Sequence, residues 1–227
     1  RGRSNDFQGE KPLLQNQGHR QAYIAYQKGT LVYNLLADYL GEDVFHGALK
    51  QFMSDYRLSG PPYPTVLTMR EYIAAVTPDS LDYLLIDWLD EITFYENQIA
   101  EVNFEETGKY QYEVTAQLLV QKYRSDQTGK PQYQAKGKSL QAMHPMTGES
   151  LESLPLRDYV EVVVYGQTAD EQEIELTRRM LRFNEILQEV RLTLDQLPTR
   201  IAIDPDYKLL DQKPENNSFD VQDARPQ

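Results

Sequence analysis

The chain has no cysteine and no long apolar run. Without cysteine there is no disulfide framework, no thiol nucleophile and no zinc site built from thiolates, and the redox compartment is left open. Apolar residues never run together for the roughly 18 positions that a membrane-spanning helix needs, so nothing within this chain is expected to cross a bilayer.

Basic residues are scarce relative to acidic ones. Lysine and arginine number 23 against 35 aspartates and glutamates, which gives a formal net charge of -12. Such a charge repels the phosphate backbone of nucleic acids and the surface of an anionic membrane. We therefore expect no nucleic-acid partner.

Common catalytic motifs are missing as well: the chain contains no H-E-x-x-H, G-x-S-x-G, P-loop or G-x-G-x-x-G pattern. The three histidines, His19, His46 and His144, lie in separate segments, and we interpret each as a surface or interface residue. The chain begins at Arg1 without a charged and then apolar leader, so we expect it to be a fragment of a longer protein. Taken alone, it looks catalytically incomplete.

What is present indicates a folded chain of one large domain or two modest ones. The 227 residues include 40% hydrophobic and 26% charged residues, close to globular averages. The change of period along the chain predicts an α+β fold. We expect a flexible N-terminal segment over 1–18, a helical subdomain over 19–96, an antiparallel β-sandwich over 97–211 and a loose tail over 212–227.

Helical periodicity predicts about four helices before residue 97. The first spans about 17–40, with Ile24, Leu31 and Leu35 on one face, and Gly41 ends it. A second follows over 42–58, and a capping-box pattern at Thr68 opens a short third helix. The fourth carries apolar residues at i, i+3, i+4, i+7, i+8 and i+11: Leu81, Leu84, Leu85, Trp88, Leu89 and Ile92.

Beyond Tyr95 the period falls to two, which is typical of strands with one buried face. Six or seven short strands are predicted, over 97–105, 112–121, 158–165, 173–182, 188–195 and 199–204. The polar stretch over 132–156 reads as a long loop or an extra hairpin. Short strands separated by turn signals favour an antiparallel sandwich.

Carboxylates gather near the end of the chain, at Asp204, Asp206, Asp211, Glu215 and Asp220. A calcium loop is one interpretation. However, Lys208 stands where a further oxygen ligand is needed and no glycine follows, so acidic caps of turns explain the residues better.

The segment 22–29 concentrates two tyrosines, a lysine and a glycine within a predicted helix. A glycine in a helix interior costs about 1 kcal/mol relative to alanine, so Gly29 needs a reason such as the close approach of another element. Tyr26 and Tyr33 point nearly opposite the stripe of Ile24, Leu31 and Leu35. They are either packing tyrosines, the commoner role, or phenols that face a cleft.

The run Tyr26-Gln27-Lys28-Gly29 resembles the Y-x-K-G segment of aminopeptidase-N-like gluzincin zinc metallopeptidases. The similarity covers roughly residues 22–217. Four stretches, YQKGTLVYNLLADYLGEDVF, PPYPT, DWLDEITFYEN and LPTRIAIDPDYKLLDQKPENN, are similar to the C-terminal region of bacterial membrane proteins that fuse an ABC-2-type transporter permease to such a peptidase domain.

The resemblance implies a role for each matching residue. Tyr26 would donate a hydrogen bond to the oxyanion that forms on a peptide substrate, because a neutral phenol is a donor at neutral pH. Tyr23, Lys28 and Gly29 would support the motif through packing and positioning. The family's H-E-x-x-H, later glutamate and G-x-M-E-N do not occur here, so the ligands of the zinc cofactor are expected upstream of Arg1.

Two functions stay open from the sequence. In the first, the chain is the C-terminal fragment of a membrane-tethered zinc metallopeptidase, lies on the outer side of the membrane and is inactive and metal-free by itself. In the second, it is a non-catalytic peptide-binding or scaffolding module coupled to an ABC-type transporter. A carbohydrate-binding module is disfavoured, because Trp88 falls on the apolar stripe of a helix.

Overall fold

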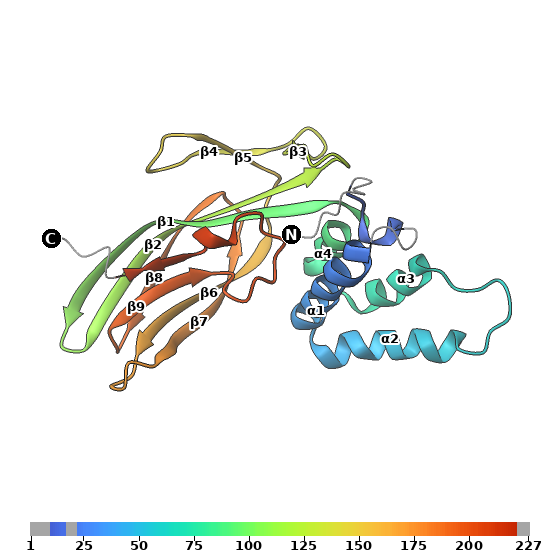
Figure 1. Cartoon of the computed structure of the whole chain (residues 1–227), viewed down its shortest axis with the longest axis horizontal. Helices are drawn as coiled ribbons and strands as arrows, with labels where there is room; N and C mark the ends of the chain where they lie inside the picture. The colour runs from blue at the N-terminus through green and yellow to red at the C-terminus, as the bar shows by residue number, and fades with distance from the viewer. Residues whose placement is uncertain (1–9, 17–21, 222–227) are drawn as a thin grey trace. The chain divides into compact units, whose positions relative to one another are not determined.

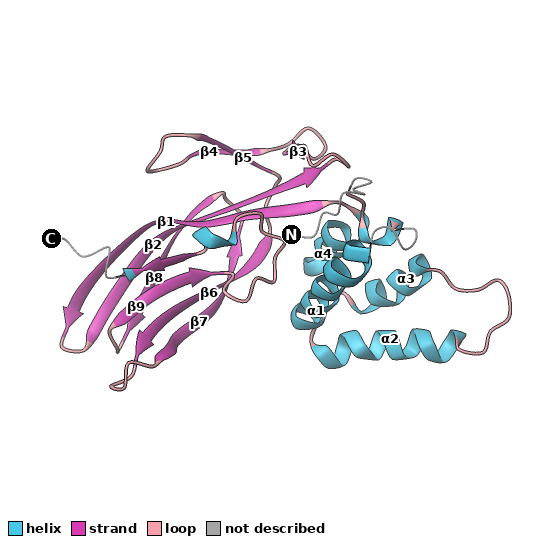
Figure 2. Ribbon diagram, viewed as in Figure 1, coloured by secondary structure: helices cyan, strands magenta, loops and turns pink. Residues whose placement is uncertain are grey.

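The protein has an α+β fold with helices in its N-terminal part and antiparallel sheets after them (Figure 1). The computed structural model describes residues 10–16 and 22–221. It divides into two compact units: one comprises Arg1–Thr93 with Ser125–Pro131, and the other comprises Phe94–Arg124 with Gln132–Gln227. Figure 2 shows the larger helices in the first unit and the longest strands in the second.

The first helix is continuous but changes its winding. Tyr23–Lys28 form a π-helical turn that passes directly into α1, Gly29–Leu40. Gly41 ends α1 with φ 89°, a left-handed conformation that glycine adopts without strain. Contrary to the predicted stripe, Leu31 is 43% exposed, while its neighbour Val32 is buried. The π turn changes the angular spacing on which the prediction relied.

Helices α2, Glu42–Tyr56, and α3, Val66–Val76, pack through aromatic rings. Phe52, Tyr56 and Tyr72 form a cluster with ring centroids 5.4 to 6.2 Å apart. The predicted start of α3 at Thr68 is wrong: Thr65 is the N-cap, and its side chain accepts from the Thr68 amide at 3.4 Å. Thr68 instead closes the capping box from the third helical position.

The fourth predicted helix consists of three short pieces: a 3-10 turn at Asp79–Leu81, α4 at Asp82–Leu85 and a π turn at Ile86–Asp90. Its apolar residues form the core of this unit as predicted, since Leu84, Leu85, Trp88, Leu89 and Ile92 are all buried. Trp88 packs edge-on against Tyr39 with the ring centroids 5.5 Å apart.

The N-terminal segment is more ordered than the sequence predicts. Residues 1–9 and 17–18 lie outside the described residues, but 10–16 are placed, with a 3-10 turn at Leu13–Gln15. Glu10 is only 7% exposed and forms an ion pair with Lys28. The backbone amide of Glu10 also donates to the Gln127 carbonyl at 2.9 Å. These long-range contacts hold a segment whose local sequence is polar.

The residues described from Thr93 to Val221 form two four-stranded sheets and a separate hairpin. Their strands are β1 Thr93–Gly108, β2 Gln111–Ser125, β3 Pro131–Gln132, β4 Leu140–Met143, β5 Ser150–Ser153, β6 Asp158–Gln167, β7 Glu173–Phe183, β8 Leu187–Leu194, β9 Pro198–Ile203 and β10 Ser218–Asp220. In the first sheet, β2 pairs with β1, β3 and β8; in the second, the order is β10-β9-β6-β7. The predicted six or seven strands are all present, and the described residues add short ones.

The polar stretch over 132–156 forms the extra hairpin that the sequence allowed. Strands β4 and β5 pair antiparallel, with Leu140 opposite Ser153. Leu151 of this hairpin packs with Leu119 and Ile186 in a small apolar cluster. The hairpin is therefore anchored by a buried side chain.

A buried polar cluster joins the two sheets of the second unit. Asp158, at the start of β6, accepts hydrogen bonds from Lys122 Nζ on β2 and from the Tyr95 hydroxyl on β1, both at 2.7 Å. The Lys122 and Asp158 side chains are 4% and 3% exposed. A buried charge pair of this kind needs such additional hydrogen bonds to be tolerated.

The predicted loose tail is ordered as far as Val221. A 3-10 turn at Pro214–Asn216 leads into β10, which pairs with β9 so that Ser218 lies opposite Ala202. Val221 is only 1% exposed. The pairing partner lies in a distant part of the sequence, so local polarity is a poor guide here. Among the described residues, no helix combines the length and apolar character required to cross a membrane.

Candidate functional site around Tyr26

Tyr26 lies in the π turn that precedes α1, and its side chain faces solvent. The residue is 76% exposed, whereas Ile24 and Lys28 of the same turn are buried. Within the described part of the chain, the Tyr26 hydroxyl has no hydrogen-bond partner, while its backbone carbonyl accepts from the Thr30 hydroxyl and the Gly29 amide. The phenol is thus available as a donor on a helix that is fixed from its other side.

The other two polar residues of the motif anchor that helix. Lys28 Nζ lies 3.2 Å from Glu10 Oε1, and the Tyr23 hydroxyl donates to Glu10 Oε2 at 3.4 Å. Lys28 is 8% exposed, and burial lowers the pKa of its amine while the Glu10 carboxylate opposes that shift. Lys28 therefore ties the turn to the N-terminal segment.

Glu10 was missed from the sequence. It is 18 positions from Lys28 and lies in a segment predicted to be flexible. The available signal was Lys28 itself, because a lysine on the buried side of a helix requires an acidic partner.

Gly29 does not have the close backbone neighbour that its place in a helix suggested. A Cβ at this position would lie 3.7 Å from Leu13 Cδ1 and 3.6 Å from the Ile24 carbonyl oxygen, which is ordinary van der Waals contact. Its φ of -58° is that of a normal helical residue. The structure therefore leaves room for alanine at this site.

Tyr33 has a packing role, unlike Tyr26. Its ring lies edge-on to Phe45 with centroids 5.7 Å apart, and its hydroxyl approaches Met69 Sδ at 3.4 Å. Burial raises the pKa of the Tyr33 phenol. Of the two phenols expected to point away from the helix stripe, only Tyr26 is well exposed.

An open groove of about 560 Å³ runs beside this helix within the first unit. Its lining is mainly apolar or uncharged and comes from the N-terminal segment, the π turn, α1 and α3: Leu13, Leu14, Asn16, Ala25, Gly29, Thr30, Tyr33, Asn34, Val66 and Met69. Ala25 and Thr30 bring the groove next to the turn that carries Tyr26. The site thus combines an exposed donor with a nearby apolar concavity.

No protein-family model matches the chain, and no curated protein matches it either.

The two described histidines, His46 and His144, belong to no metal-binding group. His46 is exposed and stacks at a tilt on Phe45, while His19 lies outside the described residues. The surface interpretation is wrong for His144, which is 7% exposed and accepts the Met146 and Thr147 amides on Nδ1, both at 3.2 Å. Over residues 10–16 and 22–221, no group of three or more histidine, cysteine, aspartate or glutamate side chains could hold a metal ion.

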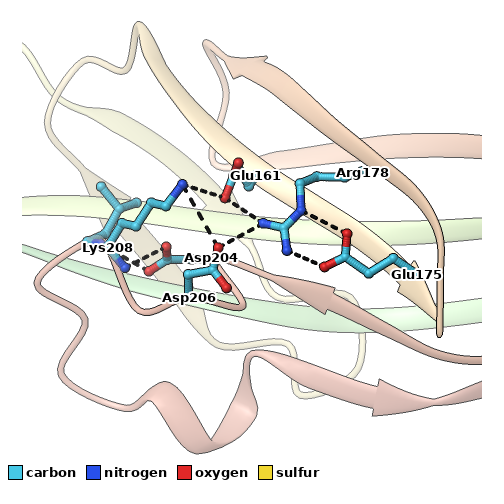
Figure 3. A network of polar contacts seen from close by, with 7 residues as sticks. Glu161, Glu175, Arg178, Asp204, Asp206 and Lys208 are labelled. Atoms are coloured by element: carbon cyan, nitrogen blue, oxygen red, sulfur yellow. Dashed lines mark hydrogen bonds and ion pairs between the residues drawn. The ribbon is translucent and has the colours of Figure 1, made fainter. Parts of the chain in front are cut away.

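A second polar cluster lies on the strand-rich unit (Figure 3). Arg178 of β7 contacts Glu161 at 2.9 Å and Asp206 at 2.8 Å, and it also pairs with Glu175. Lys208 approaches Glu161 at 3.0 Å. Arg178 and Lys208 both form ion pairs with the surrounding carboxylates, so this network connects β6 and β7 to the loop after β9.

Asp204 begins that loop and caps it, as the turn interpretation of the late carboxylates predicts. Its carboxylate accepts the amides of Lys208 at 3.0 Å and Leu209 at 3.1 Å. Burial raises the pKa of Asp204 to about 7, and the nearby Asp211 and Glu161 add to this shift, against the two amide hydrogen bonds. The carboxylate oxygens of Asp204 therefore stabilise the conformation of the loop.

Proposed function

We propose that this chain is the C-terminal portion of a membrane-tethered, aminopeptidase-like zinc metallopeptidase, in which Tyr26 stabilises the oxyanion formed during peptide hydrolysis. The proposal rests on the resemblance of Tyr26-Gln27-Lys28-Gly29 to the family's motif and on the geometry of that motif. It places this part of the full-length protein on the outer side of the membrane and takes a peptide as the substrate.

The exposed phenol of Tyr26 is the observation that carries the proposal. Its hydroxyl has no partner in the described residues, while Lys28 and Tyr23 hold the same turn through Glu10. A donor that is fixed before the reaction needs little reorganisation when charge develops on the substrate. A tyrosine that served only packing would be expected to bury more of its ring.

The described residues do not provide the zinc site that the resemblance implies. They bring together no suitable ligand group, so we assign the zinc ligands to another part of the full-length protein. The role derived for this chain is limited to its own residues: Tyr26 donates a proton in a hydrogen bond, and Lys28 with Glu10 orients the turn that carries it.

Replacement of Tyr26 by phenylalanine in the full-length protein tests this role. We expect kcat for a peptide substrate to fall on the order of 10²–10³-fold, because one oxyanion donor is lost. Zinc content and the circular-dichroism spectrum should not change. Tyr63→Phe is the matched control, since Tyr63 is 72% exposed in the same unit and lies outside the motif.

Equal kcat values for the Tyr26→Phe variant and the parent protein would refute the assigned role. Full-length protein without any zinc-dependent peptidase activity would instead favour the non-catalytic peptide-binding module. The isolated chain is expected to show no such activity, and zinc-dependent cleavage by it would contradict the assignment of the ligands.

A further inference from the structure

The connection between α2 and α3 combines exposed apolar side chains with an absence of charge. No charged residue occurs over 58–69, although 26% of the whole chain is charged. Four apolar side chains of this stretch are 49% to 88% exposed: Leu58, Tyr63, Val66 and Leu67. Figure 1 shows the connection extending beyond the ends of both helices. An uncharged, apolar loop thus projects into solvent from this pair of helices.

The backbone of this loop has few hydrogen-bond donors that still need water. Three of its residues are prolines, which have no N–H group: Pro61, Pro62 and Pro64. The Ser59 amide donates to the Tyr56 carbonyl at 3.1 Å, and the Thr65 amide donates to the Thr68 hydroxyl at 3.3 Å. Because an unsatisfied amide is costly away from water, these features lower the cost of moving the loop into a less polar medium.

Cationic side chains border the loop on the side of α2. The spacing of Lys50, Met53 and Arg57 places them on one face of this helix, and Met53 is 65% exposed. Asp55, which lies between Met53 and Arg57 in the sequence, accepts from the Tyr72 hydroxyl at 2.7 Å. Long cationic side chains can keep their charge among lipid headgroups while apolar neighbours enter the acyl boundary.

We propose that residues 58–67 form a membrane-contact loop that inserts shallowly into a zwitterionic lipid bilayer, with Leu58 and Leu67 as its anchors. Insertion of this kind depends on the apolar area that enters the lipid and needs no complementary shape in the partner. A stable protein interface typically uses about 20–30 residues on each side, which is more than this loop contains. A projecting loop therefore suits a lipid surface better than a protein.

The charge of the chain determines which bilayer is favoured. A net charge of -12 repels an anionic surface, and Lys50 and Arg57 oppose that repulsion only locally. The apolar contact itself does not depend on the charge of the lipid. We therefore expect the chain to bind phosphatidylcholine vesicles more strongly than vesicles with added phosphatidylglycerol. The proposal is independent of the role assigned to Tyr26.

Co-sedimentation of the chain with phosphatidylcholine vesicles measures this binding. The double variant Leu58→Asp/Leu67→Asp should lower the partition coefficient at least about tenfold, because two anchors become charged. An aspartate in the first turn of α3 is favourable for the helix, so the fold should persist, which the urea midpoint checks. Tyr110→Asp/Tyr207→Asp is the matched control: it adds the same two charges at side chains that are 67% and 58% exposed, and it should bind like the parent.

A fluorescent reporter locates the contact. The emission of Leu58→Trp should shift to shorter wavelength with phosphatidylcholine vesicles and should be quenched by brominated phosphatidylcholine. Tyr110→Trp, in the turn between β1 and β2, should show neither change. The native Trp88 is only 2% exposed and contributes a constant background.

Four outcomes would overturn the proposal. The first is that the parent chain does not bind phosphatidylcholine vesicles, and the second is that both double variants bind them equally well. The third is binding only to vesicles with phosphatidylglycerol, which would indicate an electrostatic contact. The fourth is a parent chain that dimerises without binding vesicles and becomes monomeric in Leu58→Asp/Leu67→Asp, since the loop would then be an interface between two copies.

Discussion

Asp204 shows how a single residue couples the fold to pH. Its carboxyl is 2% exposed, and its pKa is raised from 3.8 to about 7, first by burial and then by Asp211 and Glu161. The folded protein therefore binds this proton more tightly than the unfolded chain does. The resulting stabilisation is fully present below about pH 4 and is lost as the pH rises through about 7.

Substitution of Asp204 by asparagine should remove this dependence. We expect the free energy of unfolding of the parent chain to fall between about pH 4 and 7 relative to that of Asp204→Asn, by a few kcal/mol at most. Urea unfolding of both proteins across this range measures the difference. Parallel pH profiles would show that Asp204 does not titrate in this window.

The first helix follows the predicted apolar spacing in part, but it contains a π turn that this spacing does not predict. Its buried residues Ile24, Leu35 and Leu36 follow from helical spacing, but the π turn at Tyr23–Lys28 does not. A spacing argument assumes constant winding, so it misplaced Leu31 and treated Tyr33 like Tyr26. Glu10 could not be assigned to the site because its contact with Lys28 spans 18 positions.

In the strand-rich unit, too, the elements with a strong local pattern were predicted and those that depend on distant contacts were not. Alternation in β2 or β6 is strong because one face of each strand is buried, and these strands were predicted closely. The segment around β10 has no such signal, since its order depends on Asn217 and its pairing with β9. The N-cap of α3 was predicted at Thr68 and not at Thr65, because Thr68 satisfies the same local sequence pattern.

Gly29→Ala tests the geometry of the first helix. The added Cβ meets ordinary contacts and φ is helical, so the intrinsic preference of alanine should prevail. We expect an increase of about 0.5–1 kcal/mol in the free energy of unfolding. A clear loss of stability in chemical denaturation would indicate a tight approach that the structure does not show.

At the scale of the whole molecule, the strand-rich unit depends on a charge pair between its sheets. Lys122→Met would remove the cation from the buried carboxylate of Asp158, which still accepts from the Tyr95 hydroxyl and the Arg157 amide. We expect a loss of about 3–5 kcal/mol in the free energy of unfolding. Arg191→Met, which breaks the exposed pair with Glu189, should cost much less, because solvent screens an exposed pair.

Comparable losses for the two variants in urea unfolding would contradict a special role for the buried pair. If Lys122→Met does not fold, Tyr95→Phe provides a milder probe, since it removes one hydrogen bond to Asp158 and leaves the ion pair in place. That variant should cost about 1–3 kcal/mol.

Tyr26 is proposed to belong to a zinc peptidase site completed by residues outside this chain. The most direct test is to determine the coding sequence that precedes Arg1 in the gene. We expect an H-E-x-x-H motif followed by a further glutamate on the next helix. A preceding region in which those ligand positions are occupied by other residues would contradict it.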